Sequence, residues 1–159
     1  MAVYPASESE KNVASADVVS LTEEETASCD LASSLPAELP EGFRFGRAAL
    51  YTTVMKSGAR YRMLRVEFIT GRIPQDVQTE DGGWMLVDPP GPIGDVFIVC
   101  VYDFEPKTER PILSSGKDAS LSEFEEKGGA FVRVGERVVA VFYDIADPAV
   151  VFKVVENLG

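Results

Sequence analysis

Residues 95–104 read DVFIVCVYDF, and this segment constrains the fold more than any other part of the 159-residue chain. Apolar side chains occupy both its odd and its even positions. In an extended strand these positions point to opposite faces, so both faces of this strand need to be covered. The sequence therefore predicts a sheet organised around one central, doubly covered strand.

Other segments have the β-branched and aromatic composition that is typical of strands. They are residues 47–56, 59–70, 84–88, 130–134 and 137–143. Ser57-Gly58 and Gly135-Glu136 separate neighbouring strands and predict two tight hairpin turns.

Two segments indicate helices. Ser120-Leu121-Ser122-Glu123 is a capping box, and Gly128 is placed to end the short helix that it opens. Asp147-Pro148 predicts the start of a C-terminal helix, although the valines that follow also permit a last strand. The predicted fold class is therefore α+β and β-rich: a small antiparallel barrel or sandwich of roughly six to seven strands with two short helices.

The charges are unevenly distributed along a chain whose net charge is −11. Residues 1–42 hold nine acids and one lysine, residues 43–72 hold seven bases and one acid, and residues 73–159 hold seven bases and 16 acids. Prolines at both ends of the segment 36–40 indicate a stiff linker before the first strand. The sequence thus predicts an extended acidic, low-complexity arm with its linker over 1–42 and a β-rich globular domain over 43–159.

The acidic arm has two open interpretations: a solvated tail, or a segment that docks on basic strands of its own domain or of a neighbour. Thr22 and Glu25 form a capping box that predicts a short helix, with a narrow apolar stripe behind it. A tryptophan after two glycines is a candidate interface anchor. The residues expected to take part in binding are Arg44, Arg47, Arg60, Arg62, Arg65, Glu23, Glu24, Glu25, Leu31, Leu35 and Trp84.

Catalytic chemistry has little support in this sequence. The chain has no histidine, which removes the commonest general base and metal ligand. Ser114 and Lys117 have the spacing of a Ser–Lys pair, but the companion motifs of that chemistry are missing. Cys100 lies between valines with no base to activate it. We therefore expect no catalytic residue, no cofactor and no metal site.

The leading hypothesis is a non-enzymatic structural or protein–protein interaction subunit of a larger assembly, such as a virion coat or accessory protein, whose acidic arm docks on a neighbouring basic surface. One alternative is an acidic inhibitor or adaptor that binds a basic or nucleic-acid-binding protein. The other is an enzyme or small-ligand-binding β-barrel with a cavity lined by Phe97, Tyr102 and Phe142.

The partners we expect are proteins, including copies of the chain itself. The negative net charge argues against direct nucleic-acid binding, and the chain has no apolar run long enough for a membrane span. Two cysteines in unlike surroundings and an N-terminus without a signal-peptide pattern predict a cytoplasmic or other intracellular location, with a virion as one possibility.

Overall fold

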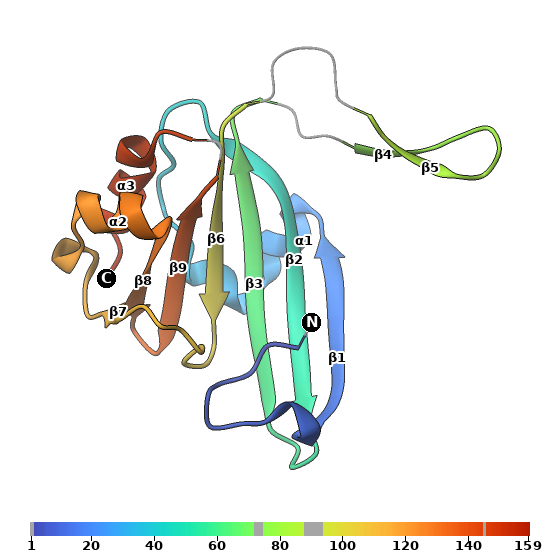
Figure 1. Ribbon diagram of the computed structural model, residues 1–159, viewed down its shortest axis with the longest axis horizontal. Helices are drawn as coiled ribbons and strands as arrows, with labels where there is room; N and C mark the ends of the chain where they lie inside the picture. The colour runs from blue at the N-terminus through green and yellow to red at the C-terminus, as the bar shows by residue number, and fades with distance from the viewer. Residues whose placement is uncertain (1, 72–74, 88–93, 145) are drawn as a thin grey trace.

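A computed structural model describes residues 2–71, 75–87, 94–144 and 146–159. Its main feature is one open sheet of seven strands in the order β1-β2-β3-β6-β9-β8-β7 (Figure 1). All neighbouring strands are antiparallel except β7 and β8. Its strands are β1 (Val13–Leu21), β2 (Arg44–Met55), β3 (Arg60–Ile69), β6 (Val96–Tyr102), β7 (Ile112–Leu113), β8 (Gly129–Val134) and β9 (Arg137–Tyr143).

The remaining elements are short. β4 (Gln75–Gln78) and β5 (Trp84–Val87) form a separate two-stranded sheet. The helices are α1 (Glu23–Ser28), α2 (Leu121–Lys127) and α3 (Pro148–Glu156), with 3₁₀ turns η1 (Glu10–Asn12), η2 (Asp30–Ser34) and η3 (Gly116–Asp118). No helix in the described ranges is long and apolar enough to cross a membrane.

β6 is the fourth of the seven strands, which confirms the predicted central position. Phe97, Val99 and Val101 are fully buried on one face, and Cys100 is buried on the other. Two apolar clusters lie on these two faces. The larger cluster packs the sheet against side chains of η2, α2 and α3, so these elements form the second layer of the fold.

The prediction of a barrel or sandwich is wrong. The sheet is not closed, because β1 and β7 remain at opposite ends of the strand order. Helices supply the layer that a second sheet would have supplied. A barrel cavity lined by the three aromatic residues is also excluded, because Phe97 belongs to the cluster on one face while Tyr102 and Phe142 belong to the cluster on the other.

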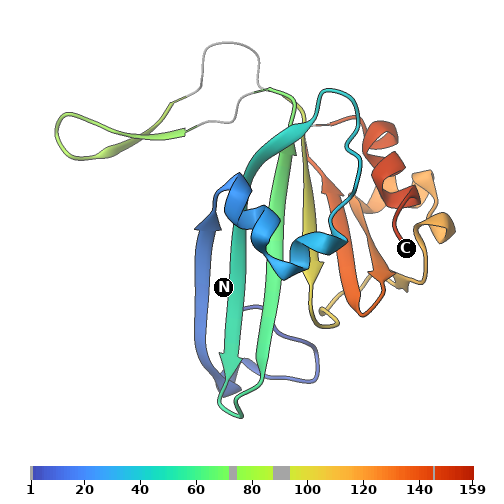
Figure 2. The same ribbon diagram turned by 180° about the vertical axis from the view of Figure 1, so that it is seen from behind.

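The structure does not show the extended arm that the sequence predicts. β1 pairs with β2 from Val13 opposite Met55 to Leu21 opposite Ala48, and α1 and η2 then return across one face of the sheet (Figure 2). The ladder satisfies the backbone groups of β1 that face β2, and the fully buried Leu31 fixes η2. The division at residue 42 stays a prediction.

Most local predictions are confirmed. The predicted strands correspond to β2, β3, β5, β6, β8 and β9, with ends shifted by a few residues, while β1, β4 and β7 are additional. The C-terminal segment is helix α3, because Asp147 caps it by accepting a 2.9 Å hydrogen bond from the Ala149 N–H. Arg72 in the basic region and Asp88 at a predicted strand end lie outside the described residues.

Candidate interaction surface

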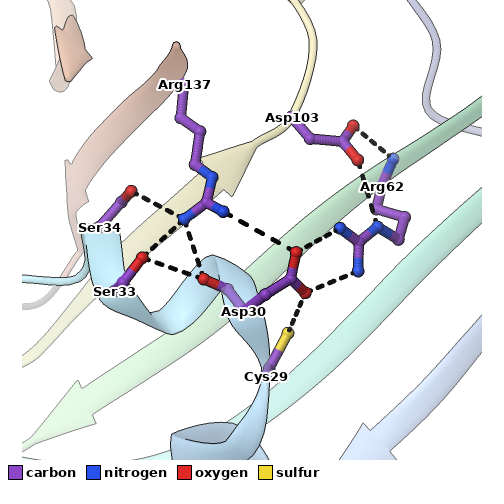
Figure 3. A network of polar contacts seen from close by, with 7 residues as sticks. All are labelled: Cys29, Asp30, Ser33, Ser34, Arg62, Asp103 and Arg137. Carbon is purple, nitrogen blue, oxygen red and sulfur yellow. Dashed lines mark hydrogen bonds and ion pairs between the residues drawn. The ribbon is translucent and has the colours of Figure 1, made fainter. Parts of the chain in front are cut away.

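The acidic and basic segments meet at Asp30, the first residue of η2. The Arg62 guanidinium on β3 donates two hydrogen bonds to the Asp30 carboxylate, from Nη1 to Oδ1 at 2.8 Å and from Nη2 to Oδ2 at 2.7 Å (Figure 3). Arg62 also bonds Asp103 beyond β6, with its backbone N–H at 2.8 Å and its Nε at 3.2 Å. Such bidentate pairing is the strongest geometry an arginine offers a carboxylate.

A second arginine approaches Asp30 from β9. Arg137 Nη2 lies 3.8 Å from Asp30 Oδ2, and Nη1 donates to the Asp30 backbone carbonyl at 2.9 Å and to the Ser33 hydroxyl at 2.7 Å (Figure 3). η2 is therefore held across β3, β6 and β9 by charge as well as by apolar contact. Neither Asp30 nor Arg137 was among the residues selected from the sequence, because only the fold brings their distant positions together.

The network has a clear electrostatic consequence. The hydrogen bond from Arg62, with the charges of Arg62 and Arg137, lowers the pKa of Asp30 to about 2. The same contact raises the pKa of Arg62, so both groups stay charged over the whole neutral range. This geometry holds a segment in place within one chain.

The other basic residues expected to bind a partner are mostly engaged within the sheet. Arg47 and Arg65 both form ion pairs with Glu67, whose carboxylate is only 8% exposed. Arg44 donates to the carbonyl oxygens of Thr70 at 3.1 Å and Gly71 at 2.6 Å. Arg60 is exposed at the start of β3.

The residues of the acidic segment that we expected to bind a partner lie in different surroundings. Glu23, Glu24 and Glu25 form the first turn of α1, where Glu25 closes the predicted capping box with Thr22. Leu31 is fully buried in the larger core cluster, and Leu35 packs partly buried against it. Trp84 is the first residue of β5. Its predicted role as an interface anchor concerns a side chain that lies outside what the structure describes.

The most exposed ordered feature is β1, which the sequence analysis assigned to the arm. Its positions 14–20 are all exposed, and Val18 and Val19 are 52% and 54% exposed on opposite faces. β1 ends the strand order, and within the described residues it pairs with β2 alone. The β4–β5 hairpin extends past β1 above the sheet in both views (Figures 1 and 2). Three valines, at positions 13, 18 and 19, are the sequence feature that could have predicted this strand.

The catalytic candidate Cys100 is buried within β6. Burial raises the pKa of Cys100 to about 11, which keeps this thiol protonated and unreactive at neutral pH. Within the described residues, no three His, Cys, Asp or Glu side chains are grouped to hold a metal ion. Comparisons of the chain with protein-family models, with curated proteins and with solved structures found no match.

Proposed function

We propose that this protein is a non-enzymatic structural component that assembles with copies of itself through the free edge of β1. The observation that carries the proposal is the long, exposed and regular edge that β1 offers. Adding a strand to such an edge is a common mode of protein recognition, because backbone hydrogen bonds supply the affinity.

Natural sheets usually protect their edges with short strands, prolines, charges or bulges. The opposite edge follows this rule, because β7 has only two residues. β1 has nine residues, no proline and a single charged side chain, Asp17. Its pairing with β2 is irregular between Val13 and Ser15 and regular from there to Leu21. Seven consecutive residues therefore present an edge that a partner strand can match.

The pattern of β1 favours a second copy in one register. In an antiparallel pair related by a two-fold axis through Val18, residues 15–21 face residues 21–15 of the partner. Asp17 then lies opposite Val19, on the same face of the extended sheet. A register centred on Asp17 would oppose two like charges, which destabilises a strand pair. A register centred on Val19 would align only five residues of each strand, because residues 17–21 would face residues 21–17 of the partner.

The acidic segment has a contact within its own chain, which is one of the two docking modes left open by the sequence. Asp30 is already bonded to Arg62 and Arg137 of its own chain. Asp30 therefore anchors η2 in cis, and the strand that precedes α1 stays available for pairing. This division of roles supports assembly through the backbone edge instead of through acid–base docking between neighbours.

Two lysine substitutions test both the proposal and its register by sedimentation velocity over a concentration series. Val18→Lys places two lysines opposite each other across the two-fold axis, so we expect it to weaken the dimer by about tenfold or more. Val19→Lys is the matched control, because its lysine lies opposite Asp17 of the second copy and preserves association.

Three results would count against the proposal: a wild-type protein that stays monomeric at all concentrations, equal dimerisation by Val18→Lys and wild type, or loss of the dimer in both variants to the same extent. Circular dichroism of each variant checks that the sheet is intact.

A further inference from the structure

We infer that a cleft beside Arg110 is a binding site for a small aromatic carboxylate. The cleft has a volume of about 550 Å³ and opens where the loop before β7 meets β8 and β9. This size is in the range of small-molecule sites. Its lining consists of Thr108, Glu109, Arg110, Lys127, Phe131 and Phe142.

The first observation is an unsatisfied buried donor. Within the described part of the chain, Arg110 Nη1 is buried and has no hydrogen-bond partner. A buried charged donor without an acceptor is costly, and native proteins nearly always satisfy such a group. Arg110 as a whole is only partly buried and lines the cleft, so a carboxylate bound there can pair with its guanidinium, whose planar fork it matches.

The second observation is the aromatic surface next to this charge. The Arg110 guanidinium lies 5.6 Å from the centre of the Phe142 ring. The Phe142 and Phe131 rings pack edge to face, with 5.6 Å between their centres. An apolar ring bound here would contact aromatic side chains while its carboxylate reached the guanidinium.

A third observation shows that the Arg110 side chain is closely packed against β8. Gly129 begins β8 at a point where a Cβ atom would lie 3.0 Å from Arg110 Nη1 and 2.4 Å from a carbon of the Phe142 ring. Only glycine leaves room for both side chains at this position. The Arg110 backbone N–H also donates a 3.0 Å hydrogen bond to the Thr108 hydroxyl, which shapes the loop in front of β7.

The charges at the cleft select an anion with one acidic group. Arg110 and Lys127 provide two cations, and Glu109 provides one carboxylate. The resulting single positive charge matches a monocarboxylate better than a multiply charged phosphate. The ligand class is therefore an aromatic ring that carries one carboxylate.

The test titrates four probes into the full-length protein and follows amide chemical shifts by NMR. Benzoate carries both features, acetate lacks the ring, benzyl alcohol lacks the charge, and inorganic phosphate is an anion without a ring. We expect benzoate to bind best and to shift the amides of Gly129 and Phe142. Absence of these shifts, or equal binding of phosphate and benzoate, would overturn the assignment.

Two variants locate the site. Arg110→Met should weaken benzoate binding by about tenfold or more, whereas Arg60→Met, which removes an exposed arginine outside the cleft, should leave it unchanged. If Arg110→Met fails to fold, Arg110→Lys takes its place, because it keeps the charge and loses the planar fork. Unchanged benzoate affinity in the Arg110 variant would overturn the inference.

Discussion

Asp30 Oδ2 accepts a 2.7 Å hydrogen bond from Arg62 Nη2, across 32 positions of the chain. This contact ties the N-terminal segment to β3 and places the acidic and basic parts of the sequence against each other within one molecule. Because α1 and η2 are fixed by it, the strand before them is held as an ordered edge.

The first prediction concerns acid stability at Asp30. Its pKa is about 2 in the folded chain and about 3.9 when unfolded, so its stabilising contribution is complete above about pH 4 and is lost as the pH falls towards 2. The Asp30 side chain is 57% exposed, and solvent screening limits the contribution to about 1 kcal/mol. Urea unfolding should show a gap between wild type and Asp30→Asn that closes over this pH range. A gap that is constant from pH 6 to pH 2 would contradict the prediction.

The second prediction concerns Glu67, which is buried between Arg47 and Arg65. Burial alone would raise the pKa of Glu67, but the hydrogen bond from Arg47 and the charges of both arginines lower it. Glu67→Gln should therefore reduce the free energy of unfolding by about 1–2 kcal/mol, because the partly buried Arg65 and the more exposed Arg47 both lose their counter-charge. Glu24→Gln on exposed α1 is the control and should change it by less than about 0.5 kcal/mol. Equal effects of the two substitutions would show that the ion pairs of Glu67 contribute nothing to stability.

The third prediction concerns thiol reactivity. Cys100 is buried, with a pKa raised to about 11 by that burial, while Cys29 is only partly buried. Ellman's reagent should therefore label Cys29 in the native protein and reach Cys100 only in denaturant. Cys29→Ser should abolish native labelling, whereas Cys100→Ser should leave it intact. Rapid native labelling of the Cys29→Ser variant would mean that β6 is more open than the structure shows.

The fourth prediction concerns Gly116 at the contact between η3 and α3. The Gly116 N–H donates a 2.9 Å hydrogen bond to the Leu158 carbonyl, and a Cβ atom at this position would lie 1.8 Å from the Val155 carbonyl oxygen. Gly116→Ala should cost about 3 kcal/mol of stability, because backbone must move to relieve the clash. Gly135→Ala, in the open β8–β9 turn at φ +62°, should cost about 1 kcal/mol. Thermal unfolding of both variants measures the difference, and a smaller cost at Gly116 would contradict the packing described.

The fifth prediction uses salt to separate two modes of association. Each chain carries a net charge of −11, so pairing through the nearly uncharged β1 edge brings like charges together. Raising sodium chloride from about 50 mM to about 500 mM should therefore strengthen the dimer, because screening reduces this repulsion. Association between acidic and basic surfaces would weaken over the same range. Sedimentation at the two salt concentrations distinguishes these outcomes.

Local patterns predicted most individual elements. The apolar alternation of residues 95–104 predicted the central strand, Asp147-Pro148 predicted the start of α3, and Thr22 with Glu25 predicted the cap of α1. These features depend on neighbours within a few residues, so the sequence specifies them directly. Arg62 is a predicted interaction residue that does contact the acidic segment. Its partner Asp30 was not predicted, because the pairing depends on long-range contacts that no local pattern encodes.

The sequence by itself determined six of the strands, the hairpin turns, the helix caps and the segregation of charge, because each arises from short-range backbone and side-chain preferences or from composition. The tertiary structure decided that the sheet stays open, that the acidic segment docks in cis, and that Val13–Leu21 forms an edge. That segment has three valines among small and polar residues and no neighbouring turn signal, so its place at the edge depends on pairing with β2, a long-range contact that no local pattern encodes.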